Sequence, residues 1–202
     1  MIPLLQKAGL HVTSVQNPLT SFADDVAATR RALALQDGPT VLVGHSYAGM
    51  IVSETGTDPK VSALVYLAAR APDAGEDYPA LAAKFPAPPA SKGLVHHDGF
   101  AELSEDAFVH NFAGDLPAAK ARALYAVQGP ISDKLFASKT TQAAWHTKPS
   151  CRKSAGLRMA GRACVWNWRA SVCSACCAAT SPCAWPPRPS ASTIRRASRV
   201  KQ

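Results

Sequence analysis

The stretch TVLVGHSYAGM, residues 40–50, decides which fold the chain is expected to adopt. It opens with an apolar run typical of a buried strand, and a helix can begin soon after Ser46. Gly44 and Gly49 flank this serine in a G-x-S-x-G pattern. A serine nucleophile stands on a tight strand-to-helix turn, where a strained backbone and crowded neighbours require small residues on both sides. The stretch therefore predicts that Ser46 is a nucleophile, although an ordinary turn whose serine caps the helix gives a similar pattern.

The residue after the serine adds a second feature of such a site. The helix that follows Ser46 would direct the positive end of its dipole toward the hydroxyl. In that arrangement the backbone N–H of Tyr47 can donate a hydrogen bond to the oxyanion of a tetrahedral intermediate. We therefore expect Ser46 and the Tyr47 N–H to act together in acyl transfer.

The remainder of residues 1–70 alternates between strand-like and helix-like segments. Ser21 is expected to cap a helix whose first turn carries Asp24 and Asp25, because the helix dipole favours acidic residues there. The apolar and β-favouring runs predict strands at residues 11–15, 40–43 and 62–68, with a further helix at 47–55. Strands without polar alternation, separated by helices, indicate an α/β fold with a mostly parallel sheet that flanking helices cover on both faces.

Residues 72–138 have a different character, because prolines at positions 86, 88 and 89 break the chain. Helical pieces are predicted at residues 104–112 and 117–127, and no strong strand is expected. We interpret this segment as a helical cap inserted over one end of the sheet. Residues 147–150 look like the approach to a further strand, which is not expected to form.

Charge is divided unevenly along the chain. The first 150 residues contain 12 Lys+Arg and all 14 Asp+Glu, whereas residues 151–202 contain 10 Lys+Arg and no acidic residue. All six cysteines lie after residue 150, and all six histidines lie before it. The net charge of +8 therefore averages two unlike segments, a partial domain at 1–150 and a basic, Cys- and Arg-rich tail at 151–202.

The tail shows no sustained periodicity, and we expect it to be disordered or non-native. Its composition is typical of a GC-rich gene read out of frame. Sequencing the gene tests this hypothesis, which would be contradicted if no neighbouring reading frame encodes a strand with an Asp and a His. Two other interpretations are a zinc site that includes Cys173 and Cys176, and non-specific contact of the arginines with RNA or an anionic membrane. The C-x-x-C has no histidine to complete it, and no aromatic base-stacking platform accompanies the arginines. We expect no metal, no specific nucleic acid and no membrane partner.

Stretches spread over nearly all of the first 150 residues carry a likeness to a known family, among them VTSVQNPLTS at 12–21, GHSYAG at 44–49, DPKVSALVYLAA at 58–69 and AWHTKPS at 144–150. Together they resemble small bacterial, esterase-like α/β-fold hydrolases. The resemblance implies hydrolysis of a small-molecule ester or related acyl substrate, without a cofactor, through an acyl-enzyme at Ser46. It also implies that Tyr47 provides one oxyanion-hole N–H, that His45 has a packing or hydrogen-bonding role, and that the segment after Asp73 shapes the acyl pocket.

Three parts of that family's machinery are not found in the sequence. Members begin with a strand and a His-Gly loop that provides a second oxyanion donor, whereas this chain begins inside the following helix. The triad acid and histidine should follow the serine, yet the last acidic residue is Asp133 and the last histidine is His146. His96, His97 and His110 are interpreted, with His146, as solvated surface residues and not as replacements.

A serine hydroxyl without a base is a weak nucleophile. We therefore expect an incomplete α/β-hydrolase fold with impaired activity, or a non-catalytic fragment that retains only the turn around Ser46. The chain shows no signal peptide and no apolar run near the ~18 residues that span a bilayer, so a cytoplasmic location is expected.

Overall fold

The computed structural model describes residues 1–153. Its α-helices are α1 (Ile2–Lys7), α2 (Phe22–Ala34), α3 (Ala48–Thr55), α4 (Tyr78–Ala82), α5 (Glu105–Ala107) and α6 (Ala118–Tyr125). Its strands are β1 (Thr40–Ser46), β2 (Val61–Ala69), β3 (Leu94–His97), β4 (Phe100–Leu103), β5 (Ile131–Ser132) and β6 (Ser150–Lys153). Short 3-10 helices η1 (Pro89–Gly93), η3 (Asp133–Ala137) and η4 (Ala144–His146) and a π-helical turn η2 (Phe108–Phe112) complete it. The predictions for the tail after Lys153 lie outside the described residues.

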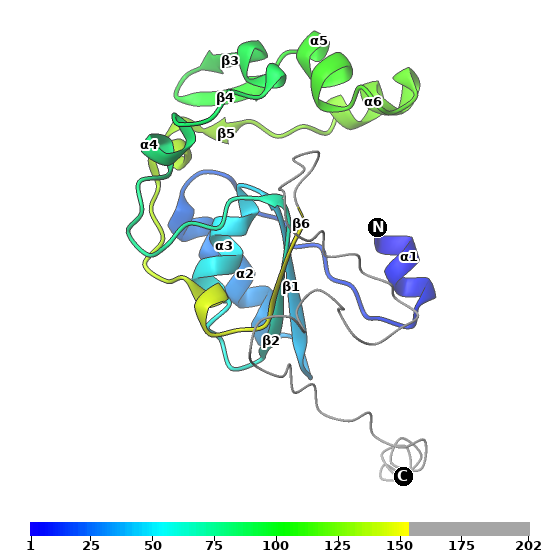
Figure 1. Ribbon diagram of the computed structural model, residues 1–202. Coiled ribbons are helices and arrows are strands. Elements are labelled where there is room, and N and C mark those ends of the chain that lie inside the picture. The colour runs from blue at the N-terminus through cyan, green and yellow to red at the C-terminus, as the bar shows by residue number, and fades with distance from the viewer. Residues whose placement is uncertain (154–202) are drawn as a thin grey trace. The chain divides into compact units, whose positions relative to one another are not determined.

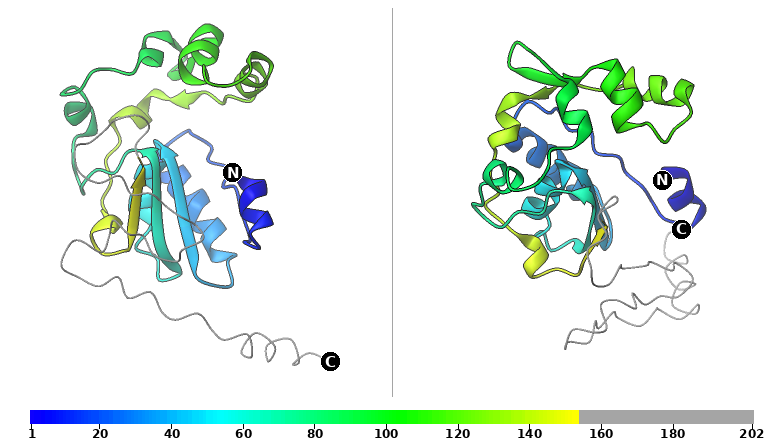
Figure 2. Two further views of the ribbon diagram at one scale, coloured as in Figure 1. Left: turned by 45° about the vertical axis from the view of Figure 1, so that its right-hand side comes forward. Right: turned by 45° about the horizontal axis from the view of Figure 1, so that its top comes forward.

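A parallel sheet with the strand order β1-β2-β6 forms the centre of the fold (Figure 1). Helix α3 connects β1 to β2, as expected of parallel neighbours that need a crossover. Helices α2 and α3 lie on the same side of this sheet in all three ribbon views (Figures 1 and 2). The predicted α/β fold with a parallel sheet and flanking helices is confirmed.

One face of the sheet is packed against these helices, and the other face is exposed on β1 and half-buried on most of β2. Leu42, Leu64 and Tyr66 are buried in a core that α2 and α3 complete. On the opposite face of β1, Val41 is 44% exposed and Val43 is 47% exposed. The prediction that helices cover both faces is therefore not met on β1 by the described residues, because α2 and α3 both pack on one side.

The boundaries of the central elements follow the sequence closely, with two exceptions. The predicted strand at residues 11–15 is wrong, because none of the described strands pairs with this segment and an extended chain needs such a partner. The strand that was not expected after Pro149 does form, as β6, and it pairs with β2 from Leu64 onward. Strand β6 is thus the point at which the chain returns to the sheet.

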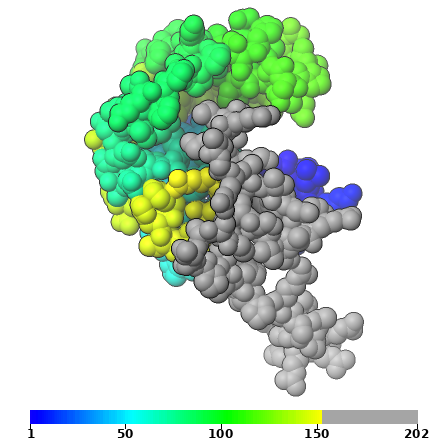
Figure 3. Space-filling view, in the orientation of Figure 1, coloured from blue at the N-terminus to red at the C-terminus, as the bar shows by residue number. Residues whose placement is uncertain are grey.

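The inserted segment (residues 72–138) lies between β2 and η4 and contains more than helices. It carries a second, antiparallel sheet with the order β3-β4-β5. The β3–β4 hairpin turns at Asp98 and Gly99, which both have positive φ, at 49° and 80°. Two positive φ angles at Asp-Gly are typical of a tight two-residue hairpin turn, so this segment contains short strands where the sequence predicted helical pieces and no strong strand. In the space-filling view the segment forms one continuous region, coloured green (Figure 3).

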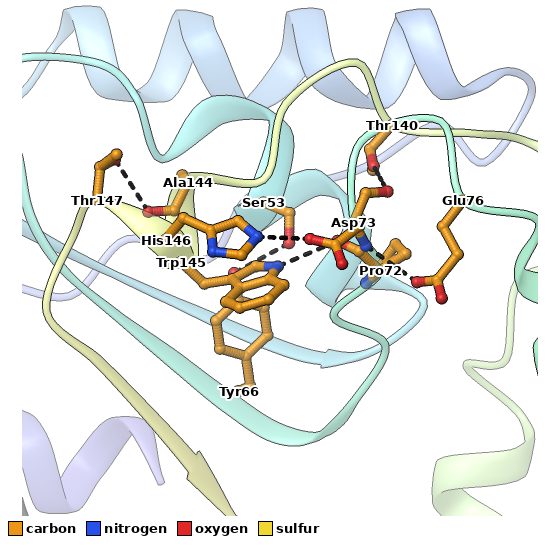
Figure 4. A network of polar contacts seen from close by, with 10 residues as sticks. All are labelled: Ser53, Tyr66, Pro72, Asp73, Glu76, Thr140, Ala144, Trp145, His146 and Thr147. Atoms are coloured by element: carbon orange, nitrogen blue, oxygen red, sulfur yellow. Dashed lines mark hydrogen bonds and ion pairs between the residues drawn. The ribbon is translucent and has the colours of Figure 1, made fainter. Parts of the chain in front are cut away.

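The two ends of the inserted segment meet beside η4 (Figure 4). The Gly75 N–H donates to the Thr140 carbonyl at 2.7 Å, and the Trp145 indole N–H donates to the Pro72 carbonyl at 3.1 Å. Asp73 and His146 form an exposed pair with 2.5 Å between Oδ1 and Nε2. The segment therefore leaves the sheet and returns to it through one hydrogen-bonded clasp.

A buried carboxylate fastens α3 to the chain that follows the inserted segment. Glu54 is 7% exposed and accepts hydrogen bonds from the Thr141 N–H at 2.7 Å, the Thr141 hydroxyl at 2.6 Å and the Gln142 N–H at 3.1 Å. Its removal breaks three hydrogen bonds to a charged acceptor and empties the buried space that the Glu54 side chain fills. Hydrogen bonds to charged groups contribute about 1.5–3 kcal/mol each, and water can replace part of this because Thr141 and Gln142 are exposed.

We predict that Glu54→Ala lowers the free energy of unfolding by about 3 kcal/mol, and Glu54→Gln by about 1 kcal/mol, since an amide keeps part of the bonding. Chemical denaturation monitored by far-UV circular dichroism measures both. Glu105→Ala is the control, because the Glu105 side chain is 57% exposed and its removal should change stability by under about 0.5 kcal/mol. Equal losses for Glu54→Ala and Glu105→Ala would contradict this account.

Candidate active site

Ser46 occupies the predicted turn between β1 and α3. Its φ is +54°, in the left-handed region that a non-glycine residue enters only under strain. Ser46 is also an exposed residue. Helix α3 begins two residues later, at Ala48. The turn thus presents the Ser46 hydroxyl at the N-terminal end of a helix, where the dipole favours negative charge.

The two flanking glycines are required by close backbone approach. A Cβ at Gly49 would lie 2.0 Å from the Arg70 carbonyl oxygen, and a Cβ at Gly44 would lie 2.8 Å from the Ala48 oxygen. Neither position has room for any side chain. The G-x-S-x-G pattern is therefore explained here by packing between β1, α3 and the end of β2.

Arg70 holds the turn from the other side. Its backbone N–H donates to the Ser46 carbonyl at 2.9 Å, just beyond a register irregularity between His45 and Ser46. Its guanidinium lies over the Tyr78 ring, 4.3 Å from the centroid, and burial lowers the pKa of this guanidinium. The sequence predictions did not include Arg70, because no local pattern indicates that the chain after β2 returns to Ser46.

The Tyr47 N–H, predicted to bind an oxyanion, donates to no acceptor among the described residues. The side chain of Tyr47 points into the protein, where it is 8% exposed and its hydroxyl donates to Asp25 at 3.0 Å. Burial, reinforced by the neighbouring Asp25 carboxylate, raises the pKa of the Tyr47 phenol. The phenol therefore stays protonated and remains the donor in this bond.

None of the six histidines forms a hydrogen bond with Ser46, and all six are exposed. Three of them pair with carboxylates: His96 with Asp133 at 2.9 Å, His110 with Asp106 at 2.9 Å, and His146 with Asp73. Figure 4 shows the last pair beside Trp145, on which the His146 ring stacks at 3.7 Å. The interpretation of these histidines as surface residues agrees with their exposure, and the pairing with acidic partners is an addition to it.

Aromatic side chains of the inserted segment lie close to the turn. The His45 ring is 6.4 Å from the Phe112 ring, which in turn is 5.0 Å from Phe108. Phe112 is 53% exposed, so apolar surface is accessible beside the residue that precedes Ser46. A separate hollow of about 600 Å³ lies within the inserted segment between η1 and η2, and Ser46 does not line it.

Residues 1–153 contain no cluster of three or more His, Cys, Asp and Glu side chains with the arrangement of a metal site. Over the same residues, no helix has both the length and the apolarity that crossing a membrane requires.

The sequence matches the model of the alpha/beta hydrolase family over residues 10–195. The match extends past Ser150, where the likeness seen in the residues themselves ends. No curated protein matches the sequence.

Solved structures of two esterases and a pyrethroid hydrolase share the fold at low sequence identity. Polyneuridine aldehyde esterase is 20% identical with a TM-score of 0.59, over 74% of this chain and 71% of that one. A methylesterase from Arabidopsis is 18% identical with a TM-score of 0.56, over 75% and 68%. A pyrethroid hydrolase from Sphingobium faniae JZ-2 is 19% identical with a TM-score of 0.55, over 72% and 67%. At these identities the likeness concerns the fold alone.

Proposed function

Because the chain belongs to the alpha/beta hydrolase family, we propose that it is a serine hydrolase of the carboxylic ester type with Ser46 as its nucleophile. The observation that carries the proposal is the strained backbone of Ser46, at φ +54°, on an exposed turn before α3. Strain of this kind persists only where the surrounding structure enforces it, and it is concentrated at functional sites. The close approach of Gly49 to Arg70 is the enforcing contact.

In the proposed reaction the Ser46 oxygen attacks the carbonyl carbon of an ester, and the hydroxyl proton passes to solvent water, since no histidine bonds to Ser46. The carbonyl oxygen becomes an oxyanion, to which the Tyr47 N–H donates a hydrogen bond. Collapse of the tetrahedral intermediate expels the alcohol, which takes up a proton, and leaves an acyl group on Ser46. Water then attacks this acyl-enzyme and releases the carboxylic acid.

The substrate is proposed to be a small ester with an apolar part. Phe112, exposed beside His45, offers apolar contact surface next to the turn, so the inserted segment would act as a cap that shapes the acyl pocket. The names of the similar structures support this class, since they are an aldehyde esterase, a methylesterase and a pyrethroid hydrolase. No resident cofactor and no nucleic-acid or membrane partner is included in the proposal.

Slow turnover is part of the proposal. None of the six histidines bonds to Ser46, and activation of a serine requires a neighbouring base. The same observation favours a second candidate, a non-catalytic α/β-hydrolase chain that keeps the turn without its chemistry. The two candidates differ in whether the Ser46 oxygen reacts with an acyl-like electrophile.

Covalent labelling separates the two candidates. A fluorophosphonate reacts when a serine oxygen displaces fluoride from phosphorus, so it reports nucleophilicity without requiring turnover. We predict a single phosphonyl adduct, located by peptide mass spectrometry at Ser46, and no adduct in Ser46→Ala. Equal labelling of the exposed Ser14 would show only general reactivity, and absence of any adduct would support the non-catalytic candidate.

A further inference from the structure

Asp25 is a fully buried acidic residue that the proposed chemistry does not use. It lies in the first turn of α2 and is 0% exposed, whereas the neighbouring Asp24 stays on the surface and bonds to the Ser21 cap. Burying a carboxylate is costly unless hydrogen bonds compensate. The position of Asp25 is therefore not explained by the helix dipole, which Asp24 already satisfies at the surface.

Two donors reach the Asp25 carboxylate from different parts of the chain. Its Oδ2 accepts from the Tyr47 hydroxyl at 3.0 Å, and its Oδ1 accepts from the Leu19 N–H at 2.8 Å. Tyr47 is the residue after the proposed nucleophile and carries the proposed oxyanion donor. The carboxylate thus binds the side chain of Tyr47, the residue whose backbone N–H must point toward the reacting carbonyl.

Leu19 extends this connection to the inserted segment. Its φ is +58°, an unfavourable value for leucine, and its carbonyl accepts from the Ser132 N–H of β5 at 2.9 Å. Leu19 and Ile131 pack on the same core cluster as Tyr47. Asp25 is therefore the common partner of the turn at Ser46 and of the loop to which β5 is bonded.

We propose that Asp25 is a positioning residue. Through Tyr47 it fixes the Ser46–Tyr47 turn, and through Leu19 it fixes the position of that turn relative to β5. The proposal rests on the proposed function only in naming Ser46 as the reacting group. A shift of about 1 Å in a reacting group can slow a reaction by about two orders of magnitude, so a partial loosening should slow it by about tenfold. The carboxylate itself touches neither substrate nor the reacting atoms.

Two measurements on the full chain test the proposal. The first is the rate constant of Ser46 labelling by a fluorophosphonate, and the second is amide hydrogen exchange of residues 46–49 and 131–132. Asp25→Ala and Tyr47→Phe should each slow labelling by about tenfold and speed exchange at both sites. Asp25→Asn should recover most of the loss, because an amide can bond to both Tyr47 and Leu19. The double variant should be no slower than Asp25→Ala alone, since that change already removes the hydrogen bond that Tyr47→Phe breaks.

Glu54→Ala is the matched control. It removes another buried, hydrogen-bonded carboxylate, at the opposite end of α3 from Ser46, and it should lower stability without changing labelling or local exchange of the turn. Unchanged labelling and exchange in both Asp25→Ala and Tyr47→Phe would overturn the proposal, as would an equal effect of Glu54→Ala. If Ser46 of the unmodified chain takes no label, the proposed function fails, and the exchange of residues 46–49 still decides whether Asp25 positions the turn.

Discussion

Hydrolysis of p-nitrophenyl acetate should fall to the background rate when Ser46 is replaced by alanine. This ester has a good leaving group and needs little protonation of the departing oxygen, so it suits a nucleophile that lacks a bonded histidine. In serine hydrolases with a complete triad, loss of the nucleophile costs about 10⁶-fold. Here the unmodified protein is expected to hydrolyse the ester more slowly than such enzymes do. Ser46→Ala should therefore remove the whole part of the rate that depends on this serine. Release of p-nitrophenolate, followed by absorbance over a range of enzyme concentrations, measures it.

Surface histidines can also hydrolyse p-nitrophenyl acetate, because all six are exposed and free imidazole cleaves activated esters. The comparison must therefore be made between Ser46→Ala and Ser14→Ala, which removes an exposed hydroxyl outside the site. Ser14→Ala should keep the full rate. Identical rates for all three proteins would place the hydrolysis on surface groups and not on Ser46.

Gly49→Ala should be among the most damaging single-methyl additions in the chain. The new Cβ would lie 2.0 Å from the Arg70 carbonyl oxygen and 2.8 Å from the Ala69 Cβ. The nearest atom belongs to the backbone, so relief requires α3 to move away from the end of β2. Overpacking costs typically 1–3 kcal/mol and occasionally more, and we expect about 3 kcal/mol here. Urea denaturation measures the loss, and fluorophosphonate labelling of Ser46 should slow in parallel.

Gly38→Ala is the control for this change, because nothing lies within 4 Å of the position that its Cβ would take. Its backbone φ is not positive, so alanine should be tolerated within about 0.5 kcal/mol. A Gly49→Ala protein as stable as Gly38→Ala would mean that α3 and the end of β2 are not packed as the structure has them.

The elements around Ser46 could be predicted from the sequence because their signals are local. The apolar run of β1, the Ser21 cap of α2 and the spacing of Gly44 and Gly49 each lie within one element. The fold class followed from these, and the family match confirms it. The predicted cap at Ser21 is confirmed, because the Ser21 hydroxyl accepts a hydrogen bond from the Asp24 N–H at the start of α2.

The hairpin of the inserted segment was missed although a signal was present. Asp98-Gly99 is a strong two-residue turn pair, and the runs on either side of it are short enough to be strands. Its histidines and glutamate hid the pattern, because the strands show little apolar alternation although Ala101 and Ser132 are buried. Polar strands of this kind are held by backbone pairing, which composition does not reveal.

The contacts that hold the turn were beyond local patterns for a different reason. Asp25 and Tyr47 are 22 positions apart, and Arg70 approaches Ser46 from the end of another strand. Both relations depend on how α2 and β2 pack, which is a tertiary property. A partial signal exists for Asp25, since it precedes Val26 and Thr29 on the buried side of α2.

The clasp at the ends of the inserted segment has a consequence for how this fold can change. Since Gly75 and Thr140 are already joined, the chain between them begins and ends at nearly the same point. The entropy of closing such a loop grows only with the logarithm of its length, by about 0.6 kcal/mol per doubling. Changes in length between α4 and α6 should therefore leave the sheet folded, whereas Ile131 and Leu135 must be kept because they pack on the core cluster of α2 and α3. The part of the chain between α4 and α6 can vary in sequence and length while the residues around Ser46 stay the same.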